Sequence, residues 1–224
     1  MTDAPLIFED VPLLGPHGGS VSLTVPAHQA VSLVGDAGSG VNELGAMALA
    51  LTIPDRGRIL VYGEDMAAMP RRTALAFRRR VGYVPAGDGL LQNLSLAENV
   101  ALPLRFGSAM STREIDGRLR IMLAAVRLGA AAELRPAEAD EEQRRRTSLA
   151  RALAFDPDLV ILEQPFDGLG GRAVGELLEV ARGGETAEGS RRSLLIVGQY
   201  LPSRLQSRVE MRHRMVRGEL QTEA

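Results

Sequence analysis

Three closely spaced glycines, Gly35, Gly38 and Gly40, carry the first chemical signal of the sequence. They follow a short apolar run that starts at Ala30 and precede a run with helical spacing that reaches Leu51, so the stretch predicts a strand, a loop and a helix. Glycines at such a turn let successive backbone N–H groups converge on one point, where they can bind a phosphate ahead of a helix. The stretch therefore has the glycine frame of a phosphate-binding loop.

The side chains that complete phosphate chemistry are missing from this loop. The pattern G-x-x-x-x-G-K-[ST] needs a lysine and then a hydroxyl, but Ser39 and Gly40 are followed by Val41 and Asn42. Valine cannot neutralise a phosphate, and an asparagine amide is a poor substitute for the hydroxyl that ligates magnesium. All 26 residues counted as lysine or arginine are arginines, so no lysine elsewhere can supply the charge. On these residues alone, the loop is either a plain glycine-rich turn or a degenerate phosphate-binding loop.

Composition indicates a globular chain and excludes several kinds of chemistry. With 224 residues, 45% of them hydrophobic and 24% charged, the chain is long enough for one large core or a core plus a smaller lobe. A net charge of -2 gives no electrostatic case for binding nucleic acid, and the absence of cysteine excludes disulfides and thiolate chemistry. We expect no signal peptide in MTDAPLIFED, and no direct membrane insertion, because no apolar stretch approaches the ~18 residues of a span.

Alternating strand and helix patterns would position the glycine loop. Apolar alternation and short apolar runs predict strands at 6–9, 20–25, 30–34, 58–63, 81–84, 159–162 and 193–197, with strand-like pieces over 209–220. Helical spacing predicts helices at 69–80, 111–128 and 171–181, with Gly129 as the stop of the second and a polar loop at 183–190. The pattern predicts an α/β core with parallel strands and a mostly helical insertion from about 88 to 145.

The order of these landmarks resembles that of the ATP-binding subunits of ABC transporters, from about residue 6 to residue 220. The segment VGYVPAGDGLLQNLSLAENVALPL at 81–104 is similar to the Q-loop region of that family. RRRTSLARALAFDPDLVILEQPFDGL at 144–169 is similar to its signature helix and Walker B strand, and SLLIVGQYL at 193–201 to its H-loop. ENVALPL and PFDGL look most like subunits of Mce-type phospholipid transporters and related lipid-export systems. The resemblance implies one domain with a RecA-like P-loop core, 1–87 and 146–224, and a helical lobe, 88–145.

Position by position, the resemblance also implies that the nucleotide chemistry of the family is lost. The P-loop lysine falls on Val41 and its hydroxyl on Asn42, while the Walker B aspartate falls on Glu163 and the catalytic glutamate on Gln164. Glu163 would hold magnesium badly without its hydroxyl partner, so no metal site is firm. Gln164 can orient water but cannot accept a proton at neutral pH. The D-loop aspartate falls on Gly170, and no aromatic residue stands near 13–17 to stack on adenine.

The residues at three further positions also differ from those that serve nucleotide chemistry in the family. The Q-loop glutamine falls on Ala86 and the H-loop histidine on Gln199. The signature LSGGQ falls on Ala139, Asp140, Glu141, Glu142 and Gln143, of which only the glutamine is kept. These acids suit the positive end of a helix dipole and form a good N-terminal cap, and they would repel a phosphate brought to the same place.

The sequence thus predicts a degenerate ATP-binding subunit, a pseudo-ATPase, in which ATP and magnesium binding is weak or absent. Its implied partners are an integral membrane permease and a second ATP-binding subunit, in a homodimer or a heterodimer, at the cytoplasmic face of the membrane. A divergent but active ATPase and a soluble interaction module remain as alternatives. Five leucines either receive a permease helix or form the core of the lobe: Leu90, Leu91, Leu94, Leu96 and Leu102.

Overall fold

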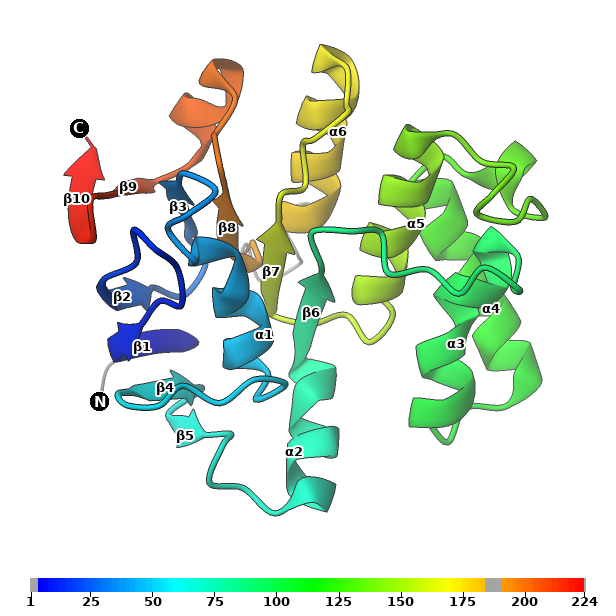
Figure 1. Ribbon diagram of the computed structural model, residues 1–224. Helices are drawn as coiled ribbons and strands as arrows, with labels where there is room; N and C mark the ends of the chain where they lie inside the picture. The colour runs from blue at the N-terminus through cyan, green and yellow to red at the C-terminus, as the bar shows by residue number, and fades with distance from the viewer. Residues whose placement is uncertain (1–3, 184–190, 224) are drawn as a thin grey trace.

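The computed structural model describes residues 4–183 and 191–223, and a six-stranded sheet runs through this part of the chain (Figure 1). Its strands lie in the order β10-β9-β3-β8-β7-β6, and all neighbours are parallel except β10 and β9. The bounds are β3 Ala30–Gly35, β6 Val81–Val84, β7 Leu159–Glu163, β8 Ser193–Gly198, β9 Met211–Val216 and β10 Glu219–Glu223. The predicted α/β core with parallel strands is confirmed. Apart from Gly183, the predicted polar loop at 183–190 lies outside the described residues.

A second, antiparallel sheet packs beside the first and has the strand order β2-β1-β4-β5. Its strands are β1 Leu6–Pro12, β2 Ser20–Val25, β4 Arg58–Val61 and β5 Glu64–Asp65. The strand predicted at 58–63 ends early, because Tyr62 and Gly63 take positive φ values of 51° and 80° and turn the chain. The sequence patterns located β1, β2 and β4, but they did not predict β5 or show that these strands form a separate sheet.

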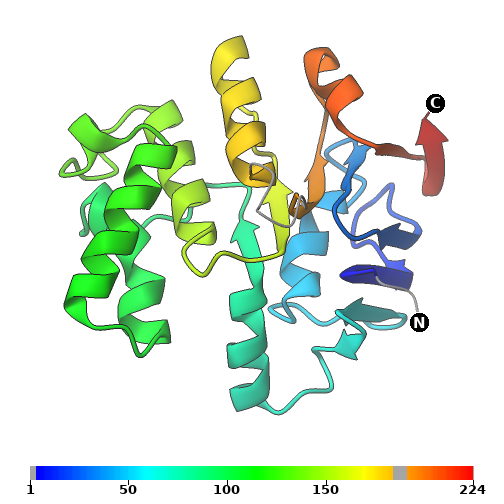
Figure 2. The same ribbon diagram turned by 180° about the vertical axis from the view of Figure 1, so that it is seen from behind.

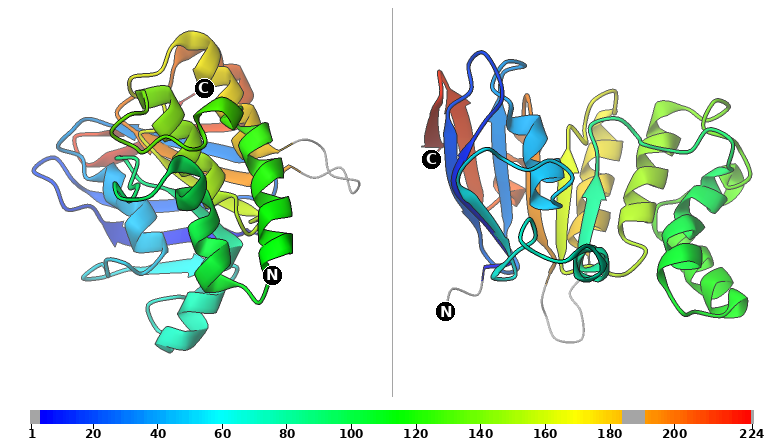
Figure 3. Two further views of the ribbon diagram at one scale, coloured as in Figure 1. Left: turned by 90° about the vertical axis from the view of Figure 1, so that its right-hand side faces the viewer. Right: turned by 60° about the horizontal axis from the view of Figure 1, so that its bottom comes forward.

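The helices fall into two groups around the sheets. The bounds are α1 Leu44–Ala48, α2 Arg71–Phe77, α3 Leu96–Gly107, α4 Thr112–Ala125, α5 Glu141–Ala152 and α6 Gly171–Arg182, with 3-10 turns η1 Val41–Glu43, η2 Arg78–Arg80, η3 Gly129–Ala131 and η4 Ser203–Arg208. The views from behind and from below place α3, α4 and α5 together beyond β6, at the side away from β1 and β2 (Figures 2 and 3). None of the described helices is long and apolar enough to cross a membrane.

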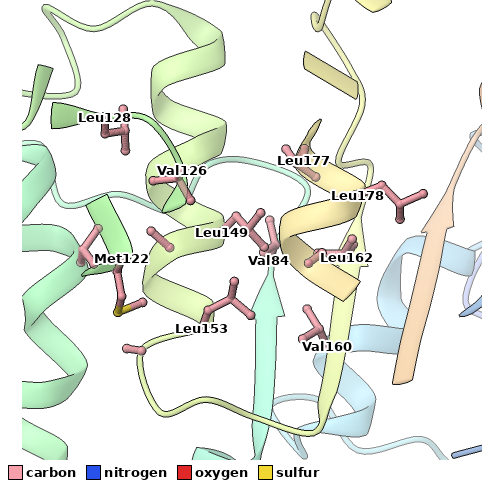
Figure 4. Packing of buried hydrophobic residues seen from close by; sticks show 14 of the residues in the cluster. Val84, Met122, Val126, Leu128, Leu149, Leu153, Val160, Leu162, Leu177 and Leu178 are labelled. Carbon is pink, nitrogen blue, oxygen red and sulfur yellow. The ribbon is translucent and has the colours of Figure 1, made fainter. Parts of the chain in front are cut away.

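The large sheet separates two hydrophobic cores, because successive side chains of a strand point to opposite faces. Val160 and Leu162 of β7 face the first core with side chains of α3, α4, α5 and α6, among them Leu149, Leu153 and Leu178 (Figure 4). The alternate residues of β7, Leu159 and Ile161, face the second core with β1, β2, β4 and α1. Every residue of β3, β7 and β8 is buried, as expected for strands covered on both faces.

Two helix ends differ from the sequence prediction for the same reason. The helix after the glycine loop ends at Ala48, where Ala50 adopts a left-handed φ of 49° and the Leu51 N–H donates to the Ala46 carbonyl at 2.9 Å. At the end of α4, Arg127 has a φ of 59° and the Leu128 N–H donates to the Leu123 carbonyl at 2.9 Å. Both are Schellman caps formed without glycine. Gly129 was therefore wrong as the stop of this helix, since it begins η3 instead.

The five leucines around the start of α3 mostly pack within the protein. Leu90 and Leu96 are buried, Leu94 and Leu102 are partly buried, and only Leu91 is clearly exposed. Residues 88–145 contain α3, α4, η3 and the first part of α5, which continues past residue 145. The division into lobe and core at these boundaries stays a prediction.

Candidate functional site

The glycine loop between β3 and η1 is closed by its own hydrogen bonds. Asp36 Oδ1 accepts the Gly38 N–H at 3.0 Å, and the Asp36 carbonyl accepts the Ser39 N–H at 3.1 Å and the Ser39 hydroxyl at 2.7 Å. Asp36 Oδ2 also lies 3.4 Å from Nδ1 of His17. Two N–H groups that a phosphate would use therefore already have acceptors, and one acceptor is an anion.

A second segment lies across the loop. The His17 N–H donates to the Gly38 carbonyl at 3.0 Å. Gly15 lies so close to the same carbonyl that a Cβ at this position would overlap it, and a Cβ at Gly38 would lie 2.9 Å from His17 Nδ1. These close approaches explain two of the glycines by packing rather than by a ligand.

Val41 and Asn42, the predicted positions of the lysine and the hydroxyl, both have buried side-chain atoms. Val41 is 1% exposed and belongs to the second core. A Cβ built on Gly35 would lie 3.1 Å from Val41 Cγ1 and would overlap the side chain of the buried Ser39. The amide oxygen of Asn42 is buried and has no hydrogen-bond partner among the described residues. Val41 and Ser39 thus pack close to Gly35 at the start of the loop, and Asn42 Oδ1 is left without a donor.

Glu163, at the end of β7, is buried against the start of the short helix α1. Its Oε2 accepts the Tyr83 hydroxyl at 2.8 Å, and a Cβ on Gly45 would overlap its Oε1. Burial raises the pKa of the Glu163 carboxyl, and the Tyr83 hydroxyl and the nearby N–H groups of Ala86, Gly45 and Ala46 oppose that rise. No N–H in the described chain reaches Oε1 with hydrogen-bond geometry, so this oxygen is an orphan like that of Asn42. The same burial, reinforced by the Glu163 charge, raises the pKa of Tyr83.

This burial makes a pH-dependent prediction for Glu163→Gln. Because the folded pKa lies above the ordinary value of 4.5, the folded protein binds the proton more tightly than the unfolded chain does. The cost of the buried charge is therefore fully present above the folded pKa and disappears as the pH falls to 4.5. Glutamine keeps an acceptor for Tyr83 without the charge. At pH 8 the variant should have a free energy of unfolding about 1 kcal/mol above that of the wild type.

Urea unfolding of both proteins between pH 5 and pH 8 measures this difference, which should shrink toward pH 5. Glu133→Gln makes the same chemical change at an exposed position and should leave no such pH-dependent gap. A gap that widens as the pH falls would contradict the prediction.

Three strand ends bring further predicted residues to the edge of the sheet that carries the glycine loop. Gln164 follows β7 with a φ of 43°, and its N–H donates to the Val197 carbonyl at 2.8 Å. Gln199 follows β8 and is exposed. The carboxyl ends of parallel β3, β7 and β8 share one edge, so these residues lie on the same side of the sheet as the loop. Ala86 follows β6 at that edge, and its carbonyl accepts Arg145 Nη1 at 2.7 Å.

The acids at the start of α5 form the helix cap that the sequence predicts. Asp140 Oδ1 accepts the Gln143 N–H at 2.7 Å, and Gln143 Oε1 accepts the Asp140 N–H at 3.0 Å. Glu142 accepts Arg146 Nε at 2.8 Å. Glu141 lies 3.8 Å from Arg145 and sits against Gly168, which has a positive φ of 73°. Each acid therefore has a partner in its own chain. Ala139 precedes them and is buried.

An arginine network behind this cap was missed by the sequence prediction. Arg146 Nη2 donates to Glu176 of α6 at 2.7 Å and Nη1 to the Val126 carbonyl at 3.2 Å, so one buried guanidinium joins α5, α6 and the end of α4. Arg172 and Arg127 donate to the same Glu176 at 2.8 and 2.7 Å. Hydrogen bonds from Arg146 and Arg172, with the charge of Arg127, lower the pKa of Glu176 to about 2. The i,i+4 pairs Glu142–Arg146 and Arg172–Glu176 were the available sequence signal.

The fold brings the glycine loop and the residues at the end of β7 together, and it places the predicted signature residues elsewhere. The glycine loop, Glu163 and Gln164 share the edge of the large sheet, with Glu163 touching α1 directly. Residues 139–143 lie with α5 in the helical group beyond β6, and β8 and β7 separate β6 from β3 (Figure 1).

Comparisons with known proteins agree with this architecture. The family model described as ABC transporter matches residues 19–167. The chain is 33% identical over 171 residues to the methionine import ATP-binding protein MetN 2 of Pseudomonas aeruginosa, which covers 76% of this chain and 50% of the relative. It is 32% identical over 161 residues to the intermembrane phospholipid transport system ATP-binding protein MlaF of Escherichia coli, covering 72% of this chain and 60% of the relative. The chain thus spans only about half to three-fifths of these relatives.

The solved structure of the dimeric bacterial ABC transporter cassette MJ0796 superposes with a TM-score of 0.85 at 23% identity, over 97% of both chains. This likeness confirms the predicted cassette fold. The match of the family model to two-thirds of the sequence, together with relatives above 30% identity, establishes the family. The chain belongs to the ABC transporter family, as an ATP-binding domain with the cassette fold.

Proposed function

We propose that this chain is a pseudo-ATPase: an ATP-binding subunit that has kept the cassette architecture and lost turnover, and that serves as a structural or regulatory partner of a membrane permease. The observation that carries the proposal is the glycine loop closed by its own hydrogen bonds. Asp36 accepts two of its N–H groups, and the buried Val41 stands where the family has its phosphate-binding lysine. A loop in which two N–H groups are already bonded to Asp36, one of them to its carboxylate, has fewer donors left for a phosphate.

The residues at the neighbouring positions fit magnesium-bound nucleotide poorly. Two orphan oxygens, Asn42 Oδ1 and Glu163 Oε1, are the acceptors that these positions offer to a cation. Magnesium prefers a nearly octahedral set of oxygens shared with the phosphates of its nucleotide. Here Val41 cannot hold those phosphates, and Glu163 is already bound to Tyr83. Gln164, at the position of the catalytic base, supplies an amide rather than a carboxylate.

Phosphate release by the purified protein with magnesium and ATP tests the proposal. We expect no turnover above background, and no rescue by Gln164→Glu, because the lysine, the hydroxyl and the signature would still be missing. An active ABC ATPase assayed in parallel is the positive control, and a denatured sample of this protein sets the background. Robust turnover by the wild type or by Gln164→Glu would make the divergent active ATPase the correct interpretation.

The proposed permease site is a groove between the core and the helical group, which we call the docking groove. It has a volume of about 400 Å³ and is lined by parts of α2, η2, β6, α3 and α5. Phe106 at the end of α3 is 84% exposed and Leu75 of α2 is 51% exposed, so apolar side chains face solvent where the groove opens. Arg78 and Arg79 stand beside them. Such a surface suits an amphipathic helix with acidic residues at its edge.

The remaining details of the proposal come from the relatives. A phospholipid or related lipid is the proposed transport substrate of the whole assembly, supported by MlaF and by the family resemblance of ENVALPL and PFDGL. A second ATP-binding subunit is the proposed partner, supported by the dimeric cassette structure. In this assembly the chain would lie at the cytoplasmic face of the membrane, held there by the permease.

A further inference from the structure

A groove rich in arginine lies between α6, η4 and the residues that follow α4. It has a volume of about 530 Å³ and contains none of the residues of the glycine loop or the docking groove. Two glutamates line it, Glu176 and Glu179. Five arginines line it as well: Arg127, Arg146, Arg172, Arg204 and Arg208. We call it the arginine groove, and its side chains carry a formal excess of three positive charges.

The carboxylates of the arginine groove are already shared. Glu176 accepts from Arg127, Arg146 and Arg172 at 2.7 to 2.8 Å, and Glu179 accepts Arg208 at 2.9 Å. One carboxylate therefore serves three guanidinium groups. Its strongly lowered pKa, about 2, reflects the positive potential around it. More donors remain in this groove than the glutamates can satisfy.

Arg204 has no carboxylate or carbonyl partner among residues 4–183 and 191–223. Its guanidinium lies against the α-carbon of Gly171 in the first turn of α6, at a place where a Cβ would overlap it. Gly175, one turn further along the groove, has only Arg208 Nη1 in contact range, 3.8 Å from a Cβ built there. The glycine at 171 thus makes room for an arginine that no group in the described chain neutralises.

We propose that the arginine groove binds an anion that carries clustered phosphate groups, such as a diphosphate. A diphosphate has about three negative charges near neutral pH, which match the formal excess of the groove. The planar guanidinium forks of Arg204, Arg172 and Arg127 suit phosphate oxygens, to which arginine donates paired hydrogen bonds. This inference is independent of the proposed function, because no residue of the glycine loop takes part.

Titration calorimetry with inorganic pyrophosphate tests the inference. We expect binding by the wild type and a loss of affinity of at least about tenfold in Arg204→Glu, because a charge-assisted donor is replaced by a repelling charge. Arg217→Glu makes the same change in the exposed turn between β9 and β10 and should bind as the wild type does. Equal affinity in all three proteins, or no binding by the wild type, would overturn the inference.

A matched pair of glycine variants tests whether the position of the Arg204 guanidinium, apart from its charge, affects binding. Gly171→Ala would displace the Arg204 guanidinium without removing it, and we expect the affinity for pyrophosphate to fall by about threefold or more. Gly175→Ala adds the same methyl group where only an ordinary contact is available, and its affinity should stay at the wild-type value. The two variants change the same helix, so equal weakening by both would contradict a role for Arg204.

Vesicles distinguish the two sources of phosphate. Wild-type protein and Arg204→Glu are sedimented with vesicles that contain cardiolipin, whose headgroup carries two phosphates, and with phosphatidylcholine vesicles, with and without pyrophosphate. Retention on the anionic vesicles that needs Arg204 and is competed by pyrophosphate identifies a lipid headgroup as the source. Pyrophosphate binding without such retention identifies a free phosphate compound. Retention that is indifferent to both Arg204 and pyrophosphate, with no calorimetric binding, would overturn the inference.

Discussion

Mixing this protein with a competent ATP-binding subunit that binds it is expected to suppress the phosphate release of that subunit by roughly a hundredfold. In the family that the chain belongs to, each composite site takes its P-loop and Walker B residues from one subunit and its signature from the other. Under the proposed function, Val41, Asn42 and Gln164 would disable the first half here. Glu141 and Glu142 would disable the other half, because the helix end that would face a phosphate carries its own anions.

The size of the effect follows from the charges. A carboxylate brought within ~4 Å of a phosphate meets a repulsion on the order of 4 kcal/mol at an effective dielectric of about 20, which corresponds to nearly three orders of magnitude in rate. Arg146 is hydrogen-bonded to Glu142, and Arg145 lies 3.8 Å from Glu141, so part of this repulsion is neutralised.

The measurement is phosphate release by the competent subunit during titration with this protein. The matched variant carries Asp140→Ser, Glu141→Gly and Glu142→Gly, which restores the family residues at the start of α5 and keeps a capping hydroxyl. It should bind the same partner and inhibit it less. Turnover that rises when wild-type protein forms the complex would show that the acidic helix end still completes a site, and the pseudo-ATPase proposal would then fail.

The second large effect is expected at the docking groove. Phe106→Asp places a charge on the most exposed of the large apolar side chains in the described chain. If a permease helix buries this ring, the substitution leaves a carboxylate desolvated in an apolar interface, and recovery of the protein with membranes should fall at least about tenfold. Ile121→Asp is the matched control, because Ile121 of α4 is 64% exposed and does not line the docking groove.

Membranes from cells that also express the permease are isolated, and the amount of each variant in the membrane fraction is compared. Both variants should unfold at the temperature of the wild type, since both side chains already face solvent. Equal recovery of Phe106→Asp and the wild type would rule out the docking groove as the attachment site.

The parts of the fold that the sequence predicted are those in which local pattern and burial agree. β3, β7 and β8 are runs of Val, Ile and Leu that are buried on both faces, so their identity as inner parallel strands could be predicted from composition alone. The cap of α5 was predictable too, since Asp140 and Gln143 stand at capping-box spacing. Family resemblance supplied the architecture that joins these elements.

The parts that could not be predicted depend on residues far apart in the chain. Tyr83 meets Glu163 only because β6 and β7 pair in a register that sets Tyr83 beside Ile161. Arg127 adopts the left-handed conformation that sequence rules assign to glycine. The N–H groups of Arg127 and Leu128 complete the Schellman hydrogen bonds there although no glycine is present. The closing of the glycine loop by Asp36 is local, but it depends on side-chain rotamers that a pattern does not specify.

The guanidinium of Arg146 has a consequence for association that goes beyond stability. It is hydrogen-bonded to α6 and to the end of α4, so the helical group and the core are tied by a residue that does not line the docking groove. The same hydrophobic core also runs from α3 and α4 to β7 and β8 without interruption. A partner helix that binds beside Phe106 would contact the core and the helical group on the two sides of the docking groove. The relative orientation of these two parts is already fixed. Little conformational entropy would then be lost on binding, and more of the contact energy would appear as affinity.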